Sequence, residues 1–114
     1  MPSNAASIAL RDIAHHIDLA THFAAGFDAD TFRADLRTVY AVTRCLEIIS
    51  EASRRLPDEM KARHPSIAWK EMAGAGNIYR HDYEDVAASY VWVTVQNHLP
   101  PLRAVIEREL AGIG

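Results

Sequence analysis

Residues 31–57 decide the fold, and they read TFRADLRTVYAVTRCLEIISEASRRLP. Apolar side chains recur in this stretch at steps of three and four residues, namely Phe32, Leu36, Val39, Val42, Leu46, Ile49, Ala52 and Leu56. This spacing lines one face of an α-helix. A proline cannot continue a helix, so Pro57 closes the run. The stretch therefore predicts one amphipathic helix that starts near Asp30 or Thr31 and ends before Pro57.

The segment before this helix has the same spacing. Its apolar residues at helical steps are Ala6, Leu10, Ile13, Ile17, Ala20, Ala24 and Phe27. Ser3 stands in front of them and has a side chain suited to capping a helix. Only a short break, from Gly26 to Asp30, separates the two predicted helices. Because short connections join antiparallel neighbours, we expect these helices to form a hairpin.

The segment after Pro57 also predicts helices. Pro57 and the two acidic residues after it favour a brief helix, and Ser66 favours the capping of another over residues 67–73. Residues 91–95 have strand propensity, but helical spacing runs straight through them at Ala88, Trp92, Val95, Leu99, Leu102, Ile106 and Leu110.

Pro100 and Pro101 lie inside this last helical pattern and should kink or restart it. The whole pattern predicts one all-α domain over residues 1–114. We expect a compact up-and-down bundle of four to five helices.

Composition excludes several classes of protein. The chain has 114 residues, with 12 Lys and Arg against 15 Asp and Glu, so its net charge of −3 rules out a generally basic nucleic-acid coat. The single Cys45 supplies neither a disulfide framework nor a cysteine zinc cage. No apolar stretch approaches the ~20 residues of a membrane span, and the N-terminus does not read as a signal peptide. We expect a cytoplasmic protein.

The strongest chemical signal is the cluster over residues 77–83, which reads NIYRHDY. A histidine such as His81 is able to take or give a proton in catalysis, while an arginine such as Arg80 stays charged and is able to hold a phosphate. Asp82, Tyr79 and Tyr83 complete the cluster. Such a set suits phosphate chemistry. The alternative is a polar helix start with solvated charges, and spacing alone does not decide between the two.

Two further groups of charged or histidine side chains share helix faces. Charged residues on the second predicted helix recur at helical steps, as Arg44, Glu47, Glu51, Arg54 and Arg55. They form either a salt-bridged exposed face or, through Arg44 and Glu51, a groove edge that supports a site on another helix. On the first helix, His15, Asp18 and His22 share one face. A polar surface explains them better than a metal, because no other helix offers an obvious fourth ligand.

Longer stretches of the sequence resemble a known family. Residues 41–52 read AVTRCLEIISEA, and residues 62–74 read ARHPSIAWKEMAG. They are followed in order by Gly76-Asn77, His81-Asp82-Tyr83, Trp92 and Leu99-Pro100. From about residue 8 to about residue 108, the chain resembles the HepT-like group of the HEPN superfamily.

The resemblance implies a helical bundle that forms a homodimer, with the site in a cleft between protomers. It implies the toxin of a type II toxin–antitoxin pair, a ribonuclease that needs no metal or other cofactor and cuts RNA. The implied partner is a minimal nucleotidyltransferase antitoxin that adds AMP to a tyrosine of the toxin. In this chain Tyr83 matches the modified position, and Asn77 and His81 match the active-site pattern.

One position departs from the family pattern, which has an arginine immediately before the asparagine. This chain has Gly76 there, and an arginine at Arg80 instead. We therefore expect His81 and Arg80 to be the catalytic pair, with Arg44, Glu51, Asn77 and Asp82 in support. Neighbouring side chains on a helix splay by about 100°, so Arg80 must reach round or come from the partner protomer. The alternatives are a weakened nuclease and a module that only binds, and is modified by, its nucleotidyltransferase.

Overall fold

Each regular element in the described part of the chain is a helix. The computed structural model describes residues 4–74 and 84–113, and the side chains of all of these except residues 84–86. The elements are α1 (Asn4–Ala24), α2 (Ala29–Ala34), α3 (Leu36–Arg54), α4 (Asp58–Ala62), a short helix over residues 69–74, α6 (Glu84–Val93), the π-helical η1 (Thr94–His98) and α7 (Leu99–Ile113). The all-α prediction is confirmed.

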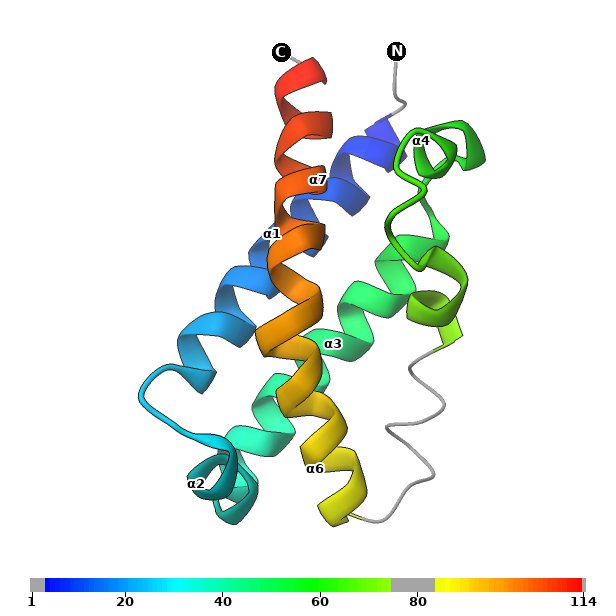
Figure 1. Cartoon of the computed structure of the whole chain (residues 1–114). Helices are drawn as coiled ribbons and strands as arrows, with labels where there is room; N and C mark the ends of the chain where they lie inside the picture. The colour runs from blue at the N-terminus through cyan, green and yellow to red at the C-terminus, as the bar shows by residue number, and fades with distance from the viewer. Residues whose placement is uncertain (1–3, 75–83, 114) are drawn as a thin grey trace.

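Three long helical segments make the body of the molecule. In Figure 1, α1 and α3 run in opposite directions as a hairpin, and α6, η1 and α7 form one continuous column that packs across them. The predicted apolar faces meet in this core, where Leu10, Ile13, Val42, Val91 and Ile106 are fully buried. The hairpin predicted from the short break at Gly26 is therefore confirmed. Gly26 has a positive φ of 86°, which glycine tolerates better than any other residue.

The second predicted helix is two helices, which corrects the sequence-based prediction. Asp35 leaves the helical conformation with φ −104° and ψ 89°, and it ends α2 and begins α3 at the same residue. Its carboxylate accepts a hydrogen bond from the Thr38 amide at 3.2 Å, as a helix-capping aspartate does. One consequence is that Leu36, expected on the buried face, is 46% exposed.

The helical turn before Pro100 and Pro101 is wider than an α-helical turn. Pro100 and Pro101 have no amide hydrogen, and a proline ring clashes with the carbonyl four residues earlier. The chain accommodates them by widening the preceding turn, so that the Leu99 amide donates to the Thr94 carbonyl, five residues back. The irregularity therefore lies before the prolines, as the π turn over Thr94–His98, and α7 runs through the prolines, where a kink or a restart was expected.

The segment that follows α4 differs slightly from its prediction. Helical residues begin at 69, so Ser66 lies outside the helix that it was expected to cap. The Met72 amide donates to the Ala68 carbonyl at 3.0 Å in the first turn of that helix. We use the term strap for residues 63–74, which run alongside α3 (Figure 1).

Candidate functional site

The predicted catalytic cluster lies outside the described residues. Asn77, Arg80, His81, Asp82 and Tyr83 all fall in the range 75–83. Of the residues expected to support the site, Arg44 and Glu51 are described, and both are exposed on α3. The described residues on either side of the cluster therefore carry the structural argument.

The chain is held firmly just before the cluster. Three donors converge on the carbonyl oxygen of Ala73: Ser50 Oγ at 3.1 Å, Arg54 Nε at 3.0 Å, and Arg54 Nη2. Ser50 is only 3% exposed, so its hydroxyl is shielded from water. A carbonyl with a guanidinium and a buried hydroxyl on it has a fixed direction. The C-terminal part of α3 thus fixes the point from which the chain enters residues 75–83.

The chain is also held just after the cluster. Helix α6 starts at Glu84, directly after Tyr83, and packs on α2 and α3. The Trp92 ring on α6 lies 5.2 Å from the fully buried Phe32 ring of α2, measured between centroids. Trp92 itself is half-buried rather than fully enclosed. The described residues on both sides of the range 75–83 therefore contact the helical core.

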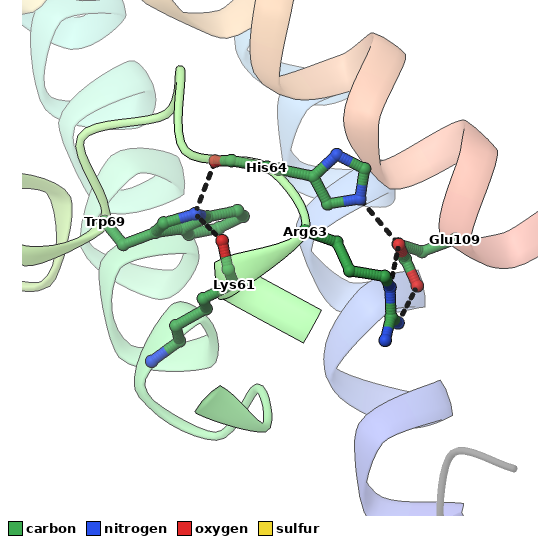
Figure 2. Close-up of polar contacts among 5 residues, drawn as sticks. All are labelled: Lys61, Arg63, His64, Trp69 and Glu109. Atoms are coloured by element: carbon green, nitrogen blue, oxygen red, sulfur yellow. Dashed lines mark hydrogen bonds and ion pairs between the residues drawn. The ribbon is translucent and has the colours of Figure 1, made fainter. Parts of the chain in front are cut away.

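A charged cluster fastens the strap to the last helix (Figure 2). Arg63 donates from Nη2 to Glu109 Oε1 at 2.7 Å and from Nε to Oε2 at 3.3 Å. His64 Nε2 lies 2.6 Å from the same Oε2, and both side chains are nearly buried, at 11% and 12% exposed. The Trp69 indole donates to the Lys61 and His64 carbonyls at 3.1 and 3.0 Å. We call Arg63, His64 and Glu109 the clasp.

The clasp makes the stability of the fold sensitive to acid. The pKa of the Glu109 carboxyl is lowered, chiefly by the hydrogen bond that Arg63 donates, against the opposing effect of burial. A carboxyl whose pKa is lower in the folded than in the unfolded chain adds stability above its unfolded pKa, here about 4.5. That stability is lost as the pH falls below this value and through the folded pKa.

We expect Glu109→Gln to lower the free energy of unfolding by about 2 kcal/mol at pH 7, because an uncharged amide replaces a carboxylate that accepts charge-assisted bonds. The deficit relative to the parent should shrink as the pH is lowered below about 4.5. Urea denaturation followed by circular dichroism at several pH values measures both effects. Glu107→Gln is the matched control, since its carboxylate is 64% exposed. A deficit that stays constant down to acid pH would contradict this role for the clasp.

The charged residues of α3 do not form one salt-bridged face. Arg44 Nη1 is 3.9 Å from Glu47 Oε2, and the arginine side chain is 67% exposed. Arg55 instead pairs with Asp12 of α1 at 3.3 Å, and Arg54 binds the Ala73 carbonyl. An exposed pair at the edge of ion-pair distance contributes little, so the Arg44 guanidinium remains able to bind an anion such as phosphate.

The histidine-rich face of α1 is occupied by other contacts. Asp18 pairs with Arg103 of α7 at 3.1 Å, and the His15 ring packs edge-on against His16 at 5.0 Å. Among the described residues, no three His, Cys, Asp or Glu side chains are grouped closely enough to hold a metal ion. Asp18 therefore serves to join α1 to α7.

Sequence reasoning missed three features of this region. It did not connect Ser50 and Arg54 to Ala73, and it gave no sign that His64 is nearly buried against Glu109. It also gave no sign of the cavity of about 330 Å³ that lies between α3, the strap and the α6–α7 column. The sequence did hold one signal for the contact with Ala73, because Ser50 is a serine at a position that the apolar spacing of α3 places in the core.

None of the described helices is long and apolar enough to cross a membrane.

Comparison with known proteins gives a consistent result. The family described as "Ribonuclease HepT-like" matches residues 13–109. The chain is 38% identical to "Probable ribonuclease HepT" of Thermococcus cleftensis, over 87% of this chain and 90% of that protein. It is 32% identical to "Putative RNase MJ0125" of Methanocaldococcus jannaschii, over 95% of this chain and 93% of that protein. No solved structure matches.

Proposed function

This chain belongs to the HepT-like ribonuclease family, and from that premise we propose that it cleaves RNA without a metal ion, using His81 as the proton-transfer group. The observation that carries the proposal is the family match itself, which spans the whole catalytic cluster. Asn77, His81 and Tyr83 retain the family's spacing within it. The coarse activity, RNA cleavage, agrees with the names "Probable ribonuclease HepT" and "Putative RNase MJ0125" of the similar proteins.

The proposed reaction needs two proton transfers and stabilisation of charge. The ribose 2′-oxygen attacks the phosphorus, a 2′,3′-cyclic phosphate forms, and the bond from phosphorus to the leaving 5′-oxygen breaks. His81 takes the proton of the 2′-hydroxyl as a general base, or gives a proton to the leaving 5′-oxygen as a general acid, and water makes the other transfer. Arg80 holds the phosphate and offsets the negative charge that develops on it, in place of the arginine missing at Gly76. Asn77 and Asp82 support the pair. Arg44 and Glu51 position groups from α3, and the exposed Arg44 guanidinium suits a neighbouring phosphate.

The attachment of both ends of the cluster supports this assignment. Proton transfer requires reacting groups within hydrogen-bond reach, so a catalytic segment gains from fixed ends. The Ser50 and Arg54 bonds to Ala73 hold one end, and the packing of α6 holds the other. The proposal also includes a homodimer, in which two copies of the cluster share one cleft, and a cytoplasmic location.

The test is incubation of the purified chain with total RNA in the presence of EDTA. Metal-independent cleavage gives discrete fragments under these conditions, because EDTA removes the divalent ions that a two-metal nuclease requires. RNA that stays intact in EDTA but is cut on addition of Mg²⁺ would overturn the metal-independent mechanism. RNA that stays intact in both would overturn the ribonuclease function.

A second candidate function follows from Gly76. Without an arginine at that position, the chain would act in a toxin–antitoxin pair as a module that binds its nucleotidyltransferase, with or without weakened cleavage. In either case, Tyr83 is the proposed site of modification. Its phenol oxygen attacks the α-phosphorus of ATP, pyrophosphate leaves, the phenol proton passes to solvent, and a phosphodiester joins Tyr83 to AMP. The added anion would repel RNA phosphate beside His81.

We expect the chain to gain AMP when it is mixed with ATP, Mg²⁺ and a minimal nucleotidyltransferase encoded beside it. The Tyr83→Phe variant should gain none, since it lacks the nucleophilic oxygen. Intact-protein mass spectrometry measures the addition. Tyr40→Phe is the matched control, because Tyr40 is 58% exposed on α3 and should leave the modification unchanged. Full modification of the Tyr83→Phe variant would show that Tyr83 is not the residue that receives AMP.

A further inference from the structure

A cavity of about 330 Å³ lies between α3, the strap and the column formed by α6, η1 and α7. Its floor is apolar and comes from α3 and α7, through Leu46, Ile49 and Leu102. Its polar lining includes Glu71 of the strap and Thr94 and His98 of η1. Met72, two residues before Gly74, also borders it. The cavity therefore adjoins the place where the chain enters residues 75–83.

The size and lining of the cavity suit one small planar ligand. Ligand pockets in proteins run from about 300 to 1,000 Å³, so this one is at the small end and has room for a single nucleoside. An apolar floor with a few polar groups at the edge is the usual arrangement in such pockets. The Tyr90 and His98 rings on the lining offer aromatic faces of the kind on which RNA bases stack.

The π turn helps to form this cavity. Its wider turn carries both Thr94 and His98 into the lining, four residues apart. The Thr94 hydroxyl donates to the Tyr90 carbonyl at 2.9 Å, so its oxygen can still accept a hydrogen bond. Single π turns inside α-helices occur frequently at functional sites. The prolines that widen this turn thus also shape the cavity wall.

The charge and the acceptor oxygens of the Glu71 carboxylate restrict which ligands fit the cavity. Glu71 lines the cavity and is exposed, and its carboxylate takes part in no hydrogen bond or ion pair with the other described residues. An ionised carboxylate accepts hydrogen bonds and donates none. It would repel a phosphate. The complementary ligand is a planar ring that presents two donors side by side.

We propose that this cavity is a nucleobase subsite that prefers guanine. The Watson–Crick edge of guanine presents two adjacent donors, N1–H and the N2 amino group, which match both oxygens of Glu71. Adenine and cytosine each place an acceptor beside their amino group, and uracil places its one N–H between two carbonyls. Only guanine pairs with a carboxylate through two hydrogen bonds. This proposal deepens the ribonuclease function and rests on it, because the subsite would hold one nucleotide of the RNA that the protein cuts.

The test measures nucleoside binding and RNA cleavage separately. The parent chain is titrated with guanosine, adenosine, cytidine and uridine, and binding is followed by NMR amide shifts. We expect guanosine to bind about 10- to 100-fold more tightly than the other three, with shifts centred on Glu71, Thr94 and His98. Glu71→Gln should weaken guanosine binding about 10-fold, because the amide keeps one acceptor and replaces the other with a donor. Glu59→Gln on α4, an exposed glutamate outside the cavity lining, is the matched control.

Each outcome decides something different. Equal affinity for the four nucleosides, no shifts at the cavity, or full guanosine binding by Glu71→Gln would overturn the subsite. Guanosine binding without RNA cleavage would support the subsite and overturn the ribonuclease function. RNA cleavage by the parent with no preference for guanosine at the cut, and none lost in Glu71→Gln, would overturn the subsite alone.

Discussion

Replacing His81 by glutamine is expected to reduce RNA cleavage about 100- to 10,000-fold, the usual contribution of a general acid or base. Glutamine is similar in size and forms hydrogen bonds, but it does not exchange a proton near neutral pH. Substrate binding should therefore change little while the chemical step is lost. The measurement is the single-turnover rate on a short fluorescent RNA in EDTA, together with the affinity of the same RNA.

The matched control for His81 is His22→Gln, an exposed histidine on α1. It should cleave at the parental rate. Cleavage by His81→Gln at the parental rate would overturn the assignment of this histidine. Arg80→Ala, measured beside it, separates the open possibilities for the arginine: a loss as large as that of His81→Gln indicates that Arg80 replaces the residue missing at Gly76.

The long helices were predictable because each buries one face along its own length. The apolar spacing of α1 gave its buried residues directly, since Ala6, Leu10, Ile13, Ile17, Ala20 and Ala24 are all nearly inaccessible. The break at Asp35 was missed for a related reason. Phe32 and Val39 are seven residues apart and both buried, so the spacing continues across the break as if the helix did. The capping side chain of Asp35 was the local sign.

The contacts that position the candidate site were not predictable from spacing. Arg54 binds a carbonyl 19 residues away, and Arg63 binds a carboxylate 46 residues away. Periodicity reports which face of one helix is buried, but not which element a polar side chain meets. The proposed catalytic cluster rests on a different signal, since its residue types and its family pattern are local in the sequence. The cavity is lined by three separate segments, so no single stretch of sequence predicts it.

The second large effect is expected at Phe32, the one buried residue of α2. Its ring is 0% exposed and lies between Phe27, at 6.4 Å, and Trp92, at 5.2 Å between centroids. Phe32→Ala should lower the free energy of unfolding by about 3 to 5 kcal/mol, through lost burial and the cavity left behind. Urea denaturation followed by circular dichroism measures the loss.

The consequence of Phe32→Ala should extend beyond stability. Trp92 belongs to α6, the helix that follows the proposed catalytic cluster in the sequence, so removing the Phe32 ring should weaken the packing of α6 on α2. We expect a lower rate of RNA cleavage even under conditions where the variant stays folded. Phe23→Ala on α1 is the matched control, because its ring is 37% exposed and it should cost well under half as much stability. Equal unfolding midpoints for Phe32→Ala and Phe23→Ala would mean that α2 does not support α6 through this ring.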